Sequence, residues 1–472
     1  MKTGLYFLRS YLSFCLLPFA ICLLFASCKK DLFITSGDAR IATSVDSLKF
    51  DTVFTSIGSV TQSFKISNRN NQKLLLSKVR LMGGSASAFK ININGRPSAQ
   101  VSDIEIAAED SLYVFVTVNI NPNAGNLPFI VKDSIQILFN GNTRFVQLEA
   151  FGQNANFLRN RIIKGNITWP NNLPYVILGS LQVDTNASLT ISRGCKIYSH
   201  ANAPFIVDGT LIINGTVNEK VVFTGDRLDE DYRNLPASWP GIYFRSSSKN
   251  NVLTFTTIKN AYQAIVAENP SGNANPKITL QQCIVENAYE AGLFCVNSSL
   301  QASNSLISNC GKNVTIILGG TYTFTNCTVA AYSSLISHKN PVLTVSNYAM
   351  QNGVAVTANL SAAFRNTIFW GESGLVGNEV VVEKRGANTF NVLFDRCLYK
   401  AATDPASSVI TSPVKNQDPL FDSVDIPRRY YDFHISKNSP AINKGAATGF
   451  LKDLDDNPRN NGLPDIGCYE KQ

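Results

Sequence analysis

The chain has 472 residues, of which 44% are hydrophobic and 16% are charged, and its formal net charge is +8. This composition excludes an intrinsically disordered protein, and the length indicates two or three domains. Lys and Arg never form a run longer than two residues, so we expect no nucleic-acid partner. Helical periodicity is nearly absent after the first segment, and turn residues recur every few positions, which predicts an all-β protein.

Residues 1–27 have a cationic start, an apolar core and a small-residue end, which is typical of an export signal. The segment ends in FASC, which resembles the bacterial lipobox except that Phe25 stands where that family usually has Leu. The resemblance implies that Cys28 carries acyl chains, each buried methylene contributing about 0.8 kcal/mol to membrane binding. We therefore expect an outer-membrane lipoprotein, facing the periplasm or the exterior, with residues 28–34 as tether. The alternative is a soluble secreted protein with an unmodified Cys28.

Residues 35–153 contain segments in which apolar and polar side chains alternate between Gly, Asn and Pro turns. The segments are Val60–Asn68, Leu74–Met82, Phe89–Asn94, Ser111–Ile120, Asp133–Gly141 and Arg144–Gly152. They predict an antiparallel immunoglobulin-like β-sandwich of about seven strands. The phrases KISN, LLLSKV and VFVTVNINPN resemble domains of the Hydin and abnormal-spindle type, which implies a spacer or docking module.

One short phrase recurs between residues 253 and 331, as TFTTIKNA, LQQCIVENA, ASNSLISNC and FTNCTVAA. Its aligned positions are Thr256, Cys283, Ser305 and Cys327, separated by 27, 22 and 22 residues. A unit this short cannot close a core alone, so we expect successive units to stack as coils of strands. An Asn ends three of the phrases, and we expect these amides to form a ladder between coils. These residues are Asn260, Asn287 and Asn309.

The phrases GSLQVDTNASLTISRGCKIY, IVDGTLIING, SWPGIYF, RNTIFWG and FDRCLY strengthen the pattern on both sides of the repeat. Together they resemble the right-handed parallel β-helix of the pectate-lyase-like superfamily. The resemblance covers residues 157–420 and implies about ten coils.

The C-terminal segment, residues 421–472, follows the phrase DPLF and contains SPAINKG, DNPR and DIGCYE. These elements resemble the terminal segment of the choice-of-anchor β-helix proteins. A solenoid has to protect its last open coil, so we expect this segment to be a cap. The resemblance implies that charged residues tie the cap down while buried or half-buried. These residues are Asp455, Asp456, Arg459 and Asp465.

Seven cysteines remain after Cys28, an odd number without a C-x-x-C pair, so neither a disulfide framework nor a zinc site is predicted. Several lie inside the repeated phrases, and we expect them to be small buried apolar residues. The seven are Cys195, Cys283, Cys295, Cys310, Cys327, Cys397 and Cys468.

Two acidic groups have some features of calcium sites. Asp453, Asp455 and Asn457 have the opening spacing of an EF-type loop, but Pro458 replaces its Gly and Pro464 replaces its closing Glu, which favours a capping turn. A second acidic group forms a loop for which solvation is the simpler interpretation. Its members are Asp226, Asp229, Glu230 and Asp231.

Polysaccharide lyases and hydrolases of this scaffold require a basic residue beside carboxylates or a cluster of Asp. Arg365, Asp395 and Arg396 are the nearest imitation, but an ordinary coil surface or loop is the default interpretation. The histidines His200, His338 and His434 are far apart in sequence. Aromatic residues could stack on sugars or simply pack in the core. Those considered are Trp239, Tyr322, Tyr332 and Trp370.

We therefore assign no catalytic, cofactor-binding or metal-binding residue, and only Cys28 as a modification site. The function predicted is a non-enzymatic envelope lipoprotein that binds extracellular polysaccharide, or a surface protein, along a β-helix face. A polysaccharide lyase or glycoside hydrolase remains an alternative by analogy of fold. A purely structural adhesin is the third hypothesis.

Overall fold

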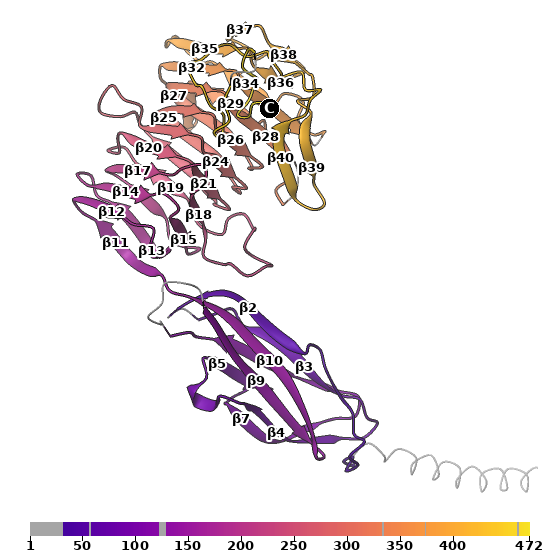
Figure 1. Cartoon of the computed structure of the whole chain (residues 1–472). Coiled ribbons are helices and arrows are strands. Elements are labelled where there is room, and N and C mark those ends of the chain that lie inside the picture. Colours follow the sequence, from indigo (N-terminus) through magenta and orange to yellow (C-terminus); the bar gives the residue numbers. More distant parts are fainter. Residues whose placement is uncertain (1–31, 56–57, 122–128, 333–334, 373, 460–461) are drawn as a thin grey trace, which may run out of the picture. The chain divides into compact units, whose positions relative to one another are not determined.

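The computed structural model describes residues 32–55, 58–121, 129–332, 335–372, 374–459 and 462–472. The export signal and Cys28 lie outside these residues. The chain divides into two compact units, residues 1–154 and 155–472 (Figure 1). Both are built from strands, which confirms the predicted fold class of a β-sandwich followed by a parallel β-helix. Within the described ranges, no helix is long and apolar enough to cross a membrane.

Unit 1 consists of two five-stranded sheets and one 3-10 helix, η1 (Gly84–Ala86). One sheet has the order β1 (Ile41–Thr43), β3 (Gln62–Asn68), β8 (Ser111–Val118), β5 (Phe89–Ile93) and β6 (Arg96–Pro97). The other has the order β2 (Ser47–Phe54), β10 (Asn142–Gln153), β9 (Phe129–Phe139), β4 (Leu74–Leu81) and β7 (Gln100–Ile106). The ten strands exceed the predicted seven because short or irregular strands carry little periodicity. The β2–β10 pair is parallel, which corrects the expectation of a purely antiparallel sandwich.

Strand β8 shows how alternation builds this core. Leu112, Val114 and Val116 are buried, whereas Tyr113 and Phe115 between them are 43% and 41% exposed. The side chains of a strand point alternately to its two faces, so one face packs against the second sheet.

Unit 2 contains a 26-stranded parallel sheet wound into coils with three faces. Face 1 contains β11 (Asn156–Ile163), β13 (Tyr175–Val183), β15 (Lys196–Ser199), β18 (Val221–Gly225), β21 (Thr256–Lys259), β24 (Ile284–Glu286), β26 (Leu306–Ser308), β28 (Thr328–Tyr332), β33 (Ile368–Glu372), β36 (Leu398–Tyr399) and β38 (Val414–Lys415). Face 2 contains parts of β11 and β13, then β16 (Phe205–Val207), β19 (Ile242–Phe244), β22 (Gln263–Glu268), β25 (Ala291–Ser303), β27 (Val314–Thr325), β29 (Leu343–Ser346) and β34 (Val380–Glu383).

Face 3 contains the second halves of β25 and β27 together with eight separate strands. These are β12 (Asn166–Trp169), β14 (Ser188–Ser192), β17 (Thr210–Asn214), β20 (Asn251–Thr254), β23 (Ile278–Gln281), β32 (Leu360–Arg365), β35 (Phe390–Asp395) and β37 (Val409–Thr411). An antiparallel hairpin, β30 (Tyr348–Gln351) and β31 (Val354–Thr357), is inserted between β29 and β32. Each strand pairs with the equivalent strand of the next coil, and face 3 has ten positions among the described residues, close to the predicted ten coils.

The aligned repeat positions stack as predicted. The strand pairings place Thr256, Cys283, Ser305 and Cys327 in register on successive coils, and all four are at most 1% exposed. Each follows a residue with positive φ that turns the chain from face 3 to face 1, such as Asn304 and Asn326. Asn tolerates this conformation better than most residues, so these two turns are encoded locally. In the two preceding coils Phe255 and Gln282 adopt the same conformation without that preference.

The C-terminal segment packs along face 1. Its hairpin, β39 (Phe421–Asp425) and β40 (Tyr430–Ile435), joins the tail in a hydrophobic cluster with outward side chains of face 1. These outward residues include Leu306, Ala330, Ile368, Leu398 and Val414. Gln282 donates to the Asp453 carbonyl at 2.7 Å, and the Cys468 amide donates to Thr328 Oγ1 at 3.0 Å. We expected a cap over the last coil, whereas these contacts run along the side of the β-helix.

Buried charges stabilise the tail, as expected for Arg459 and Asp465. Arg459 pairs with Glu470 at 3.0 Å, and both side chains are almost fully buried. The Asp465 carboxylate accepts backbone amides of Asn443 and Lys471 at 2.7 Å each. Asp456 is half-buried and pairs with Lys452.

Lys277, next to β23, is a buried cation without a carboxylate in its hydrogen-bond shell. Its ammonium donates to the carbonyls of Arg245, Ser246 and Ser248 at 2.8, 3.1 and 2.7 Å. Burial lowers the pKa of Lys277 to about 8, with the charge of Glu268 opposing the shift. The side chain is fully enclosed and ties the turn after β19 to face 3.

We predict that Lys277→Met lowers the free energy of unfolding of unit 2 by about 3 kcal/mol, because three buried carbonyls lose a charged donor. Urea titration followed by circular dichroism measures the change. Lys249→Met, at an exposed position nearby, is the matched control and should have an effect within about 0.5 kcal/mol. Equal stability of the two variants would contradict a structural role for Lys277.

Candidate functional site

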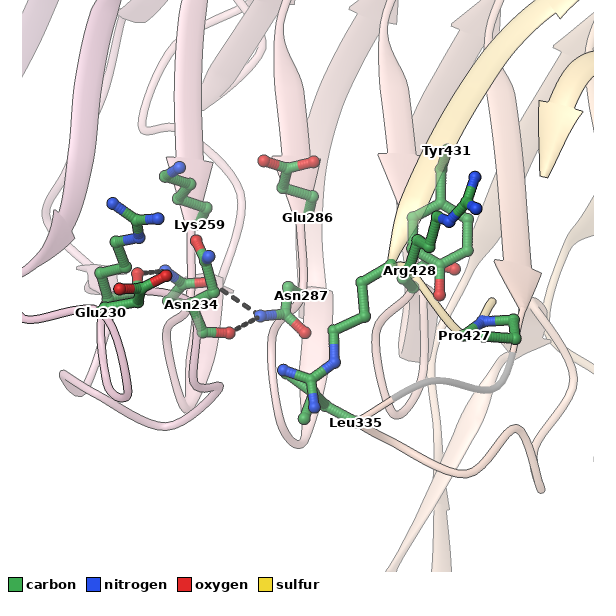
Figure 2. A pocket seen from close by; sticks show the side chains of 13 residues that line it. Glu230, Asn234, Lys259, Glu286, Asn287, Leu335, Pro427, Arg428 and Tyr431 are labelled. Carbon is green, nitrogen blue, oxygen red and sulfur yellow. Dashed lines mark hydrogen bonds between the residues drawn. The ribbon is translucent and has the colours of Figure 1, made fainter. Parts of the chain in front are cut away.

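A cleft of about 510 Å³ opens where face 1 turns into face 2 (Figure 2). The β-helix forms its floor, and the loop after β18 and the tip of the C-terminal hairpin form its walls. Its lining comprises Glu230, Arg233, Asn234, Lys259, Asn260, Glu286, Asn287, Asn309, Leu335, Pro427, Arg428, Arg429 and Tyr431.

Lys259 and Glu286 come from equivalent positions of neighbouring coils. They end β21 and β24 and are register partners, so these two opposite charges lie side by side on the outward surface. Figure 2 shows both side chains pointing the same way from adjacent strands. In the next two coils this position is Ser308 and Ala330, which are buried. The cleft therefore begins where the C-terminal segment stops covering face 1.

The predicted asparagine ladder forms part of the floor. Asn287 Nδ2 donates to Asn260 Oδ1 at 2.7 Å and to the carbonyl of Asn234 at 2.9 Å, while Asn260 Nδ2 donates to the carbonyl of Arg233 at 2.8 Å. The ladder is confirmed for this step, and it attaches the loop after β18 to the coil corner. Asn309 departs from it, because its Oδ1 accepts the Tyr332 amide at 2.9 Å.

The hairpin tip supplies the opposite wall. Arg428 and Arg429 are exposed in the turn between β39 and β40, and Arg428 lies 3.5 Å from Asp425 in a solvent-exposed pair that neutralises it only weakly. Tyr431 is the second residue of β40 and lines the cleft. Its hydroxyl is buried and has no hydrogen-bond partner among the residues that the structure describes. The rest of the Tyr431 side chain contributes to the wall of the cleft.

The cleft is positively charged. It contains four basic and two acidic side chains, which leaves a formal excess of two positive charges. Burial raises the pKa of Glu286, and the charges of Lys259 and Lys220 act in the opposite direction. Because a raised pKa favours the neutral acid, Glu286 offsets less of the positive charge than a fully ionised carboxylate would.

The residues singled out from the sequence are mostly engaged elsewhere. Arg365 and Asp395 are register partners on face 3 with Nε and Oδ2 3.6 Å apart, and Arg396 donates to the Lys444 carbonyl at 3.4 Å. In the acidic loop, Asp226 contacts His200 at 2.7 Å and Asp229 pairs with Arg227. Glu230 is the member of the predicted sets that lines the cleft.

The structure supports the capping-turn interpretation of Asp453. Its Oδ1 accepts the amides of Asp455 and Asn457 at 2.9 and 2.8 Å, and its Oδ2 accepts the Glu470 amide at 3.0 Å. Across the described ranges, no group of three or more His, Cys, Asp or Glu side chains is arranged to hold a metal ion.

The four aromatic residues weighed for sugar stacking are buried. Trp239, Tyr322, Tyr332 and Trp370 are between 1% and 8% exposed, which agrees with packing in the core. The seven cysteines after Cys28 are likewise free and buried, as predicted. Burial raises the pKa of most of their thiols, that of Cys283 to about 12, so they are neutral and unreactive.

Each of the three histidines contacts one or two carboxylates. His338 and Glu379 form a buried pair at 2.9 Å. His434, on the hairpin, contacts Asp432 at 2.5 Å and Asp455 at 3.0 Å and stacks on Tyr469. The carboxylate of Asp455, followed by that of Asp432, raises the pKa of His434 to about 9, despite an opposing effect of burial. The protonated imidazole thus connects the hairpin to the tail.

The aligned positions of the repeat are buried in the core, so they did not indicate a cleft on the outward surface. The sequence did contain a sign of a charged surface here. The residue before the closing Asn is Lys259 in the first phrase, Glu286 in the second and Ser308 in the third. The arginines of the hairpin are remote in sequence, and only folding brings them to these strands.

No family model and no curated protein matches this sequence. Solved structures match parts of it. A family 123 glycoside hydrolase from Clostridium perfringens is 9% identical over 26% of this chain and 30% of its own length, with a TM-score of 0.19. A PapD-like domain of human CEP192 is 10% identical over 24% and 84% (TM-score 0.16), and the CupB6 tip adhesin of Pseudomonas aeruginosa is 13% identical over 23% and 40% (TM-score 0.17). Likenesses this distant carry no argument about function.

We predict that stability falls as pH rises from about 6.5 to 9 through His434. The folded protein holds a proton on this imidazole that the unfolded chain releases near pH 6.5, so its contribution is complete below that pH and lost through about pH 9. The difference in thermal midpoint between the native protein and His434→Gln isolates this effect from other titrating groups. A difference that does not change over this window would contradict the assignment.

Proposed function

We propose that this protein is a non-enzymatic, lipid-anchored envelope protein that binds acidic polysaccharide in the cleft between face 1 and the C-terminal hairpin. The observation that supports this is that Arg233, Lys259, Arg428 and Arg429 line one cleft. Guanidinium and ammonium groups bind carboxylates through charge-assisted hydrogen bonds, and spaced cations suit a polymer with repeated negative charges.

Polar groups beside the cations suit the hydroxyls of a sugar. Asn234 and Asn309 line the cleft with amide side chains, and the Tyr431 hydroxyl has no partner among the described residues. A neutral surface protein would leave the cluster of cations without counter-charges, so we favour an acidic glycan.

The family-level part of the proposal rests on sequence motifs. The parallel coils with the WPGIYF and NTIFWG phrases support the pectate-lyase-like superfamily, and the DIGCYE tail supports the choice-of-anchor type. The alternation in residues 35–153 supports a Hydin-like or abnormal-spindle-like module. The export signal ending at Cys28 supports attachment to the outer membrane.

Catalysis in the same cleft is the second candidate. Glu286 has a raised pKa and lies beside Lys259, which is a combination found in acid and base catalysts. A lyase would release an unsaturated uronate, and a hydrolase would release a new reducing end. We rank it second because the main feature of the cleft is its excess of cations over carboxylates, which suits the binding of an anionic chain.

We predict that the purified full chain binds uronate polysaccharides such as polygalacturonate, alginate or hyaluronan on a glycan array, and neutral glycans much less. Lys259→Glu and Arg428→Glu should each weaken the affinity about tenfold or more, and added salt should weaken it further. Lys249→Glu, which makes the same charge change outside the cleft, is the control.

The array also separates the alternatives. Absence of binding to any glycan would favour a purely structural adhesin. Release of unsaturated or reducing-end products from the bound polysaccharide would overturn the non-enzymatic assignment in favour of the second candidate.

We predict that Cys28→Ala abolishes incorporation of labelled fatty acid and moves the protein from the membrane fraction to the soluble fraction. Two or more acyl chains anchor a protein stably, whereas the remaining chain offers no comparable hydrophobic segment after signal removal. Cys22→Ala, within the export signal, is the matched control. Membrane attachment that survives in Cys28→Ala would refute the lipid anchor.

A further inference from the structure

Two exposed tyrosines stack on each other beside the cleft. Tyr262 and Tyr289 are 43% and 53% exposed, and their ring centroids are 5.8 Å apart with an interplanar angle of 26°. They occupy the same corner position of successive coils, since the Tyr289 amide donates to the Ala261 carbonyl at 2.9 Å. Large aromatic rings in a row on the surface leave apolar area in water that a ligand would cover.

The next coil has a glycine where a third ring would lie. The Gly311 amide donates to the carbonyl of Ala288, just as that of Tyr289 donates to Ala261, so Tyr262, Tyr289 and Gly311 are equivalent. A Cβ on Gly311 would lie 2.2 Å from the Tyr289 carbonyl oxygen, so this backbone position excludes a side chain. The column of rings therefore ends at Tyr289.

A hollow of about 340 Å³ lies at this step. Tyr289 and Gly311 line it and Tyr262 does not, which places the hollow on the side of Tyr289 away from its stacked neighbour. The opposite wall is the segment 335–340, which Asn340 ties to the coil by donating to the Gly311 carbonyl at 3.0 Å. The volume is within the range of small-ligand sites.

The hollow lies next to the cleft and, like the cleft, has an excess of positive charge. Leu335 lines both, so the two lie side by side around one corner of the β-helix. Lys312, which pairs with Glu290 at 2.8 Å, and Lys339 also line the hollow and leave it with a formal excess of one positive charge. The same kind of ligand, an anionic one, therefore suits both places.

We propose that the hollow is a second subsite of the polysaccharide site, in which Tyr289, supported from behind by Tyr262, stacks against one sugar ring. Lys339 and Lys312 face the carboxylate of that uronate residue. The subsite rests on the proposed function, because it extends the glycan path from the cationic cleft. It predicts that affinity increases once a chain is long enough to reach from the cleft to Tyr289.

The test is calorimetry of the full chain with galacturonate and mannuronate oligomers of two to eight residues. Tyr289→Ala should weaken the binding of the longest oligomers about tenfold and leave the shortest unchanged, because stacking on an aromatic ring is lost only where the chain reaches it. Tyr289→Phe keeps the ring and should retain affinity. Tyr262→Ala should have a smaller effect in the same direction.

Tyr113→Ala is the matched control, since Tyr113 is also an exposed tyrosine and stacks on Phe115 at 5.8 Å in unit 1. Unchanged thermal midpoints would establish that the variants remain folded. If Lys259→Glu weakens binding but Tyr289→Ala leaves every length unchanged, the subsite is refuted while the proposed function stands. If the native chain binds none of the oligomers or polymers, the proposed function fails and the subsite fails with it.

Discussion

The pairing of each coil with the next is the interaction on which the β-helix depends. A single coil has no core, so its backbone groups and apolar side chains find partners only when an equivalent strand lies above or below. The column of Thr256, Cys283, Ser305 and Cys327 shows the consequence, because small side chains repeat where coils turn. Chain length between coils is free to vary, so loops and the β30–β31 hairpin are added at corners without disturbing the register.

The packing of the C-terminal segment depends on the regular stacking of the coils. The outward surface of face 1 is apolar where β39, β40 and the tail cover it, and charged at Lys259 and Glu286, where the cover ends. The tail itself holds the buried pair of Arg459 and Glu470, and the same oxygen of Glu470 also accepts the Asp465 amide at 3.0 Å. Buried ion pairs of this kind favour one arrangement over others because any shift leaves a charge unpaired. The cleft is thus formed by incomplete cover of an otherwise continuous face.

The charged residues that line the cleft are not the candidate catalytic residues of the sequence. Arg365 pairs with Asp395, and in the acidic loop Asp229 pairs with Arg227 and Asp226 with His200, as expected for groups that organise a surface. The cleft instead combines cations from three segments with an amide floor, and the tyrosine step at Gly311 adds an aromatic surface to the same corner. Charge, hydrogen-bonding groups and a ring face are the components that the proposed saccharide site combines.

The sequence alone determined the fold class, the stacking of the repeat and the burial of its cysteines, because each depends on local alternation and on identical positions in consecutive units. It also contained the turn signals at Asn260 and Asn287. The sequence did not reveal that the C-terminal segment lies along face 1, nor that Arg428 and Arg429 line the same cleft as Lys259. These residues are about 170 positions apart in the chain, and no local pattern indicates which outward column a remote hairpin will cover. Only the packing of apolar side chains between the hairpin and face 1 decides that, and the cleft follows from it.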